Sequence, residues 1–250
     1  MSEQHGDGEG EVQPAHEPAI LIPAGALWLM GVLAGIFLVE TLLLNQDRQL
    51  WLLNIFAFMP LRILAAGEDL ALAWPLVWTP FTHALLHAGW EHLLVNIAWL
   101  AIFATPVTRR YGTGPMLVLF FASAAAGAAA FAATNFMTVT YLIGASGGVA
   151  GLTGAAMRFI FQPIIVGRDP ETDERVVLGR RLASLGEMMR NPRSRVFTIF
   201  WLLINAAVPF LPLLTGGEGM QIAWQAHLGG FIAGLLLVPL FERPAAPADQ

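Results

Sequence analysis

The sequence of 250 residues contains no cysteine and no lysine, and only 12% of its residues are charged. Without cysteine, the chain cannot form disulfides, thiolate metal sites or a cysteine nucleophile. Soluble domains typically carry about 25% charged residues, so a charged fraction this low argues against an ordinary soluble protein. The chain has instead 56% hydrophobic residues and a mean hydropathy of +0.62. These values predict a membrane protein that crosses the bilayer several times.

The first 22 residues differ in composition from the rest of the chain. They carry five acidic residues together with glycine and proline, and they have too little apolar surface to order themselves. No lysine or arginine precedes Arg48, whereas a secretory signal peptide begins with basic residues. We therefore expect the first apolar segment to remain in the mature protein. The predicted parts are a disordered acidic tail at 1–22, a membrane domain at 23–243 and a short tail at 244–250.

Six apolar segments are long enough to cross a bilayer, which takes about 20 residues in a helix. They are residues 25–44, 91–107, 114–133, 145–162, 196–214 and 224–241. The predicted fold is an all-α membrane protein, a bundle of six transmembrane helices.

The positions of the arginines predict how this bundle is oriented. Short cytoplasmic loops collect basic residues. If the N-terminus lies inside, eleven of the 13 basic residues face the cytoplasm and only Arg48 and Arg62 face outward. We therefore expect both termini to be cytoplasmic. Arginine without lysine, in a chain rich in alanine and glycine, indicates a GC-rich bacterial genome, so the expected location is the inner (plasma) membrane of a bacterium.

Two loops are long. The outer one, residues 45–80, contains Trp51, Trp74 and Trp78, and such aromatics favour the headgroup layer. It predicts one or two interfacial helices that lie on the membrane. The inner loop, residues 163–195, is charged and cytoplasmic, and we expect its arginines to contact anionic lipid rather than nucleic acid.

Two of the apolar spans contain groups with catalytic chemistry. Ser146 lies at the start of the fourth span in the run Gly144-Ala145-Ser146-Gly147, and His227 lies in the sixth span. Polar and ionisable groups in a membrane span are costly and usually face a cavity lined by protein. A serine becomes a nucleophile when a histidine base lies within about 3 Å. The pair therefore predicts a serine protease that works inside the bilayer.

Small residues surround both members of the pair. Those expected to pack the fourth and sixth helices together are Ala150, Gly151, Gly230 and Gly234. Gly144 and Gly147, close to Ser146, leave room for the backbone of a substrate. The alternative, that these glycines only pack helices, explains the glycines but not the histidine.

The attack of a serine on a carbonyl builds an oxyanion, which needs hydrogen-bond donors. Backbone N–H groups at a helix start lack intrahelical partners, so Ser146 itself can supply one donor. His92 and Asn96 are four residues apart on the second span, share one helix face and can each donate. Taken alone, Asn96 is better explained by a hydrogen bond between helices.

The combination His92-xxx-Asn96, Gly144-x-Ser146-Gly147 and Ala226-His227-xx-Gly230-xxx-Gly234 resembles the rhomboid intramembrane serine proteases. The resemblance runs from about residue 74 to 243, and the stretch Phe81-Thr82-His83-Ala84-Leu85-Leu86-His87 is similar to bacterial rhomboids of the GlpG type.

The resemblance implies a six-helix rhomboid bundle with a Ser146/His227 dyad and no cofactor or metal. It implies an oxyanion hole made by the Ser146 N–H with His92 and Asn96, in a cavity open to the extracytoplasmic side. The outer loop would dip into the membrane, and residues 216–225 would cap the site. The substrates would be transmembrane segments of other proteins.

The chain departs from the rhomboid pattern at three positions. Many rhomboids carry an aromatic residue four after the serine, against the catalytic histidine, where this chain has Ala150. Either another residue, Trp99 or Trp224, holds His227 instead, or the rotamer of His227 is looser. The glutamate that often ends the second helix is Thr108 here, and the Trp-Arg pair frequent in the outer loop reads Trp78-Thr79. None of these positions belongs to the dyad or the oxyanion hole.

Three other functions can be weighed against the protease. A rhomboid-like pseudoprotease that binds membrane clients would be expected to have a damaged dyad, and this one is intact. A metal enzyme using His83, His87, Glu91 and His92 lacks a His-Glu-x-x-His motif. A proton-relaying transporter leaves the serine run without a role. His83 and His87 either help to retain water at the site or make ordinary polar contacts, and no motif specifies the oligomeric state.

Overall fold

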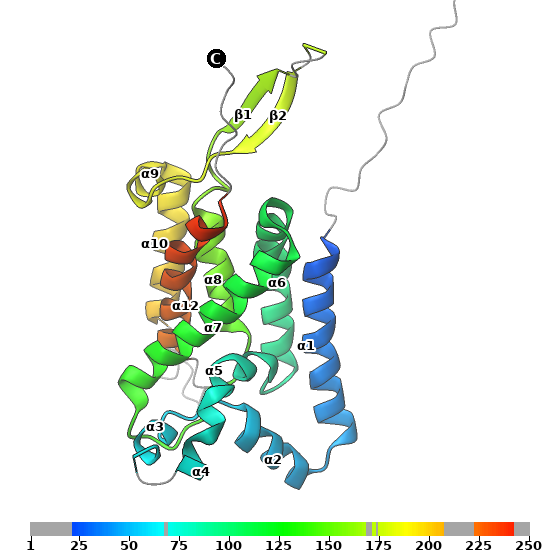
Figure 1. The fold of residues 1–250 in the computed structure, drawn as a ribbon, viewed down its shortest axis with the longest axis vertical. Helices are drawn as coiled ribbons and strands as arrows, with labels where there is room; N and C mark the ends of the chain where they lie inside the picture. Colours follow the sequence, from blue (N-terminus) through cyan, green and yellow to red (C-terminus); the bar gives the residue numbers. More distant parts are fainter. Residues whose placement is uncertain (1–21, 68–69, 169–171, 174, 208–222, 243–250) are drawn as a thin grey trace, which may run out of the picture.

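The computed structural model describes residues 22–67, 70–168, 172–173, 175–207 and 223–242. The chain forms a bundle of helices with short helices at one end and a two-stranded hairpin at the other (Figure 1). Both predicted tails, apart from Ile22, and most of the predicted cap at 216–225 lie outside the described residues.

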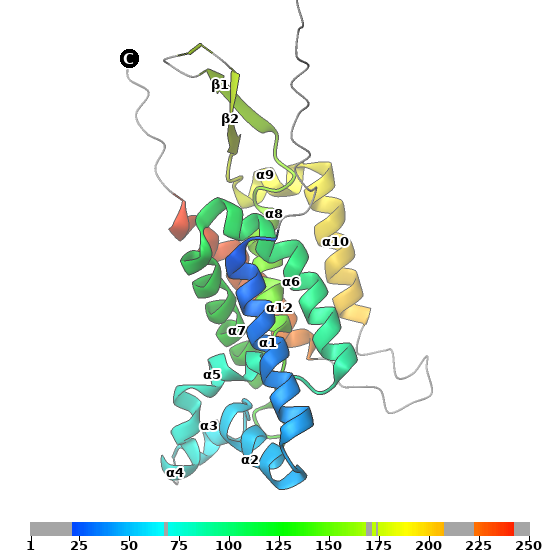
Figure 2. The same cartoon turned by 90° about the vertical axis from the view of Figure 1, so that its right-hand side faces the viewer.

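The bundle contains one helix for each predicted span (Figure 2). These helices are α1 (Ala24–Leu43), α6 (Trp90–Tyr111), α7 (Thr113–Asn135), α8 (Ser146–Met157), α10 (Pro192–Ala207) and α12 (Trp224–Leu237), which continues into the 3₁₀ turn η4 (Val238–Phe241). Four segments of the described chain are long and apolar enough to cross a membrane by themselves, namely α1, α6, α7 and Trp224–Phe241. The prediction of a helical membrane protein is confirmed.

Helix α8 ends at Met157 and is therefore shorter than the predicted span at 145–162. Every residue of α8 after Ser146 is buried, since α6, α7 and α12 pack around it. A short helix suffices at this central place, because backbone that is not helical can lie at membrane depth when protein covers it. The residue after the helix, Arg158, donates from Nε to the carbonyl of Ala183 at 2.5 Å and from Nη1 to that of Leu235 at 2.7 Å.

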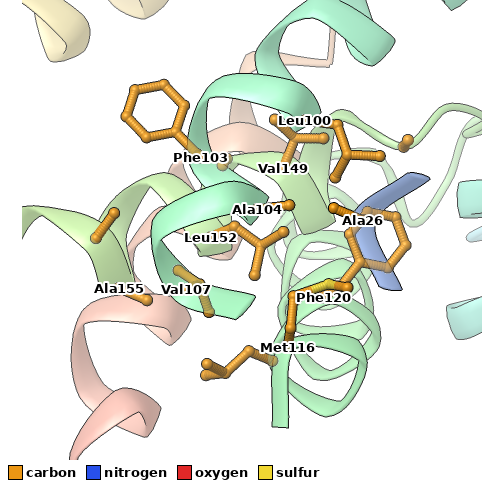
Figure 3. Packing of buried hydrophobic residues seen from close by; sticks show 14 of the residues in the cluster. Ala26, Leu100, Phe103, Ala104, Val107, Met116, Phe120, Val149, Leu152 and Ala155 are labelled. Carbon is orange, nitrogen blue, oxygen red and sulfur yellow. The ribbon is translucent and has the colours of Figure 1, made fainter. Parts of the chain in front are cut away.

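The core of the bundle lies between α6, α7 and α8, with α1 closing one side (Figure 3). Leu100, Phe103, Ala104 and Val107 come from α6, Met116 and Phe120 from α7, Val149, Leu152 and Ala155 from α8, and Ala26 from α1. Small and large side chains alternate across these faces. The ring of Phe120 fits directly against Gly148, where a Cβ atom would lie 2.6 Å from two ring carbons. This packing fixes the depth and rotation of α8 in the bundle.

The outer loop is made of several short pieces instead of one or two helices. The first piece is α2 (Gln46–Phe56), which lies across the end of the bundle (Figure 1). It is followed by α3 (Arg62–Ala65), α4 (Leu70–Ala73), η1 (Trp74–Val77), α5 (Thr79–Thr82) and η2 (His83–Leu85). Prolines at 60, 75 and 80 and Gly67 divide these pieces, because proline and glycine interrupt helices.

Two side-chain hydrogen bonds join these pieces of the outer loop. Trp78 donates from Nε1 to the carbonyl of Ile55 at 2.7 Å, and Thr82 donates from Oγ1 to that of Phe56 at 2.8 Å. These bonds attach α5 to the end of α2.

The inner loop contains a β-hairpin that the sequence analysis does not predict. Strands β1 (Ile164–Arg168) and β2 (Arg175–Arg180) pair antiparallel, with Ile164 opposite Arg180 and Arg168 opposite Arg175. Helix α9 (Leu185–Arg190) follows, and Ser184 and Glu187 close its start as a capping box. The Arg181 guanidinium and the Ser184 N–H lower the pKa of Glu187 to about 2.

Polar contacts join the ends of three elements at the hairpin end of the bundle. At the end of α6, Arg110 forms an ion pair of 2.5 Å with Glu242, and Tyr111 donates to the same carboxylate at 2.8 Å. Arg110 also donates to the carbonyl of Arg180 at the end of β2. The hairpin, α6 and the chain after α12 are therefore tied together at this end, opposite the outer loop.

Candidate active site

Ser146 is the first residue of α8, and the loop before it is held in a defined shape. Gly144 has φ +118°, a conformation that side chains with a Cβ rarely adopt. Its N–H donates to the carbonyl of His83 at 2.9 Å. Leu142 and Phe58 exchange a pair of backbone hydrogen bonds at 2.8 and 3.2 Å. The outer loop thus fixes the chain that enters α8, and Ser146 lies half-buried with its N–H at a helix start.

The helices α8 and α12 touch through their backbones. A Cβ atom on Gly230 would collide with the carbonyl oxygen of Gly147, and one on Gly234 would collide with that of Gly151. In the other direction, a Cβ on Gly154 would collide with the carbonyl oxygen of Phe231. Glycine at these positions is what allows the two helix axes to come this close.

This contact sets Ser146 and His227 beside each other in the fold. A Cβ on Gly147, the residue after the serine, would lie 3.6 Å from the carbonyl oxygen of Ala226, the residue before the histidine. Within the part of the chain that is described, no hydrogen bond joins the two side chains. Catalytic hydrogen bonds in unliganded proteins are often long and tighten only when substrate binds.

His227 has a partner on α10 that the sequence analysis misses. Its Nδ1 lies 2.7 Å from Oδ1 of Asn205. Of the two aromatic residues expected to hold this histidine, Trp99 stacks on Phe103 instead, with ring centroids 5.5 Å apart. Among the described residues, Trp224 makes no ring contact with the imidazole. An asparagine in an apolar span indicates a bonded amide, because intramembrane amides are costly unless they are bonded, but it does not specify the partner.

His92 and Asn96 lie one turn apart on α6, and His92 contacts the loop before Ser146. Nε2 of His92 lies against Gly144, since a Cβ on that glycine would be 2.6 Å from it. Nδ1 of His92 faces the N–H of Ala88 at 3.4 Å, which leaves the proton on Nε2. Asn96 is only 4% exposed and donates one of its two amide hydrogens to the carbonyl of His92 at 2.8 Å. One N–H of each residue is therefore free to serve as a donor.

The histidines before α6 lie in different surroundings. His83 is buried, and its Nδ1 lies 2.9 Å from the carbonyl of Thr79. The ring of His87 lies 5.2 Å from that of His92. His87 is 3% exposed, and neither of its ring nitrogens has a hydrogen-bond partner among the described residues. Buried imidazole nitrogens are normally bonded, so His87 points to water at the site.

The site therefore gathers a hydroxyl, three imidazoles and two amides from four helices and the loop before α6. Among the residues that the structure describes, no three His, Asp or Glu side chains come together as ligands for a metal ion. Acyl transfer uses a hydroxyl nucleophile, an imidazole base and N–H donors, and the site holds groups of each kind.

A family model described as a rhomboid domain matches residues 75–244, more than half of the chain. The chain belongs to the rhomboid family. Similar proteins include the rhomboid protease GlpG of Yersinia enterocolitica, 28% identical over 210 residues that cover 79% of this chain and 63% of that protein. The rhomboid protease GlpG of Pectobacterium atrosepticum is 30% identical over 173 residues, covering 69% of this chain and 50% of that protein. This rhomboid spans about half to two-thirds of the length of these relatives.

None of the three departures from the family pattern contributes a polar group to the site around Ser146. In this rhomboid Ala150 is buried in the core of the bundle. Thr108 is buried without a partner for Oγ1 among the described residues, and the polar contacts at that end come from Arg110 and Glu242 instead. In the outer loop Trp78 donates to Ile55, which ties the loop together without an arginine at the next position.

Proposed function

We propose that this rhomboid is a serine endopeptidase that cleaves transmembrane segments of other proteins, with Ser146 as the nucleophile and His227 as the general base. The observation that carries the proposal is the backbone contact of α8 with α12, which brings the start of α8 beside His227. Membership of the rhomboid family supports it, as do the names of the similar proteins.

In the proposed reaction, neutral His227 accepts the proton of Ser146 while the hydroxyl oxygen attacks a peptide carbonyl. The imidazolium then protonates the leaving amine, and an acyl-enzyme remains on Ser146. A water molecule, activated by the same imidazole, hydrolyses this ester. The ring nitrogens of His87 have no hydrogen-bond partner among the described residues, and this supports a route for that water.

The oxyanion of the tetrahedral intermediate would be held by three donors, the Ser146 backbone N–H, His92 Nε2–H and the free amide hydrogen of Asn96. The position of His92 against Gly144 supports this role. Gly144 and Gly147 would leave space for the substrate backbone. Helical carbonyls are already hydrogen-bonded, so the bond that is cut must lie where the substrate helix can unwind.

We further propose that both termini are cytoplasmic and that the site opens to the extracytoplasmic side. Arg110, Arg180 and Arg181 lie at the hairpin end of the bundle, and basic residues favour the cytoplasmic side. The loop that leads to Ser146 is bonded to the outer loop at the opposite end.

The test of the proposed function is labelling in membranes with a serine-directed fluorophosphonate probe, together with cleavage of a reporter protein that contains a transmembrane segment. We expect the wild-type protein to be labelled and Ser146→Ala to remain unlabelled. Equal labelling of both would show that another serine reacts. Binding of the reporter without cleavage or labelling would favour a pseudoprotease.

Asn96→Ala is expected to lower kcat by about 10²-fold, because the loss of one oxyanion donor typically has this effect. Thr105→Ala is the matched control on α6, since Thr105 also donates to the carbonyl four residues earlier but lies away from the site. The rates are measured on the same reporter, with thermal unfolding followed in parallel. If Asn96→Ala cleaves as fast as Thr105→Ala, Asn96 contributes nothing to the oxyanion hole.

A further inference from the structure

Asn205 is a polar residue near the end of the described part of α10, in a stretch that is otherwise apolar from Phe197 onward except for Thr198. An amide in a membrane span is costly unless both of its polar ends are bonded. Both ends are bonded here. Nδ2 of Asn205 donates to the carbonyl of Trp201 at 2.8 Å, and Oδ1 lies 2.7 Å from Nδ1 of His227.

These two contacts determine where the proton of His227 lies. A carbonyl oxygen can only accept a hydrogen bond, so it must be the amide nitrogen of Asn205 that faces Trp201, and the amide oxygen that faces His227. An amide oxygen is likewise only an acceptor, so Nδ1 of His227 must carry the proton. In a neutral imidazole the other nitrogen, Nε2, is then bare and able to accept one. A general base for a serine hydroxyl requires this tautomer.

A second contact between the same helices holds this pair in register. Trp201, one turn before Asn205, stacks on Phe231, one turn after His227, with ring centroids 4.4 Å apart and planes at 20°. Both side chains are buried, at 8% and 2% exposure. The stacked rings fix the spacing of α10 and α12, so Asn205 is held at hydrogen-bonding distance from the imidazole.

We propose that Asn205 is the positioning residue of the reaction, which holds the ring of His227 and keeps its proton on Nδ1. This inference rests on the proposed function of Ser146 and His227. It also accounts for Ala150. A rhomboid with an aromatic residue at that position can hold the histidine by packing. In this chain, the histidine is held by its hydrogen bond to Asn205 on α10.

The first experiment compares Asn205→Leu with Asn205→Asp in cleavage of the reporter. Leucine keeps the size of the side chain and removes the acceptor, so we expect kcat to fall about 10- to 100-fold with KM unchanged. Aspartate keeps an oxygen facing Nδ1 and loses the donor to Trp201, so most of the wild-type kcat should remain. If the residue served only to bond its own helix, the two variants would be equally impaired.

Asn135→Leu is the matched control. Asn135 lies at the end of α7 and donates to the carbonyl of Phe131 at 2.9 Å, the same bond to the residue four earlier, but it has no histidine partner. Its kcat should equal that of the wild type. An Asn205→Leu variant that cleaves as fast as Asn135→Leu overturns the proposal.

The second experiment reads the tautomer without any need for turnover. The chain has six histidines, so ¹⁵N-histidine labelling of the full protein in detergent, with His227→Gln to assign the resonance, is practicable. We expect a protonated Nδ1 and a bare Nε2 at His227 in the wild type and in Asn205→Asp, and a mixture of both tautomers in Asn205→Leu. An unchanged spectrum in Asn205→Leu overturns the proposal. If the wild-type protein shows no cleavage that depends on Ser146, that result counts against the proposed function. The spectrum still decides whether Asn205 holds the proton of His227 on Nδ1.

Discussion

Ser146→Ala and His227→Ala are each expected to slow cleavage of a reporter transmembrane segment by about 10³-fold or more. Each substitution removes a group that forms or breaks a bond in the reaction, and a general base alone contributes about 10²- to 10⁴-fold. The proteins should still fold, because the two helices meet through backbone atoms and not through these side chains. The measurement is the initial rate of cleavage in proteoliposomes, with thermal unfolding of each variant followed in parallel.

The double variant sharpens this prediction. Residues that act as one unit are not additive, so Ser146→Ala with His227→Ala should be no slower than either change alone. Ser123→Ala is the matched control, since Ser123 is another buried serine in a membrane helix and makes no hydrogen bond among the described residues. It should cleave at the wild-type rate. Normal turnover by Ser146→Ala would end the assignment of the nucleophile.

Much of this molecule could be predicted from short-range features of the sequence. Apolar length locates helices, and the helical membrane bundle and the rhomboid family are both confirmed. The sequence predicts Ser146 and His227 as site residues because each stands out against an apolar background and is flanked by small residues. These features allow prediction because they are local in the sequence. A membrane span or a motif can be recognised without knowing which helices pack against it.

The partner of His227 could not be predicted in this way. Which face of α10 meets α12 depends on the rotation of one helix against another, and a single asparagine does not specify that rotation. The aromatic candidate Trp99 stacks on Phe103, which lies one turn along on the same helix, and not on the imidazole of His227. The structure therefore replaces an expected packing contact with the hydrogen bond between His227 Nδ1 and Asn205 Oδ1.

The β-hairpin of the inner loop was missed for a different reason. Its charges suggested a loop in contact with lipid, but β-branched residues run through Ile164, Ile165 and Val166 and recur at Val176 and Val177. Two such runs separated by a short charged segment are a hairpin signal. The β-strand propensity of these residues is local, but the charges between them favour a loop.

Gly234→Ala is expected to destabilise the protein by about 2 kcal/mol or more and to abolish most of its activity. The new methyl group would overlap the carbonyl oxygen of Gly151, and backbone atoms cannot move aside as a flexible side chain can. Overpacking of this kind typically costs about 1–3 kcal/mol. The strain is relieved only if α12 moves away from α8, and that movement also carries His227 away from Ser146. Thermal unfolding and reporter cleavage measure the two effects on the same sample.

Gly35→Ala provides the control, because Gly35 also lies in a membrane helix but has nothing within 4 Å of the position of its Cβ. This variant should unfold at or slightly above the wild-type temperature, since alanine is the better helix former, and should keep full activity. The comparison separates the effect of the collision with Gly151 from the general effect of replacing a helical glycine with alanine. If Gly234→Ala were as stable and as active as Gly35→Ala, then the close approach of α8 and α12 would not be what brings the hydroxyl and the imidazole together.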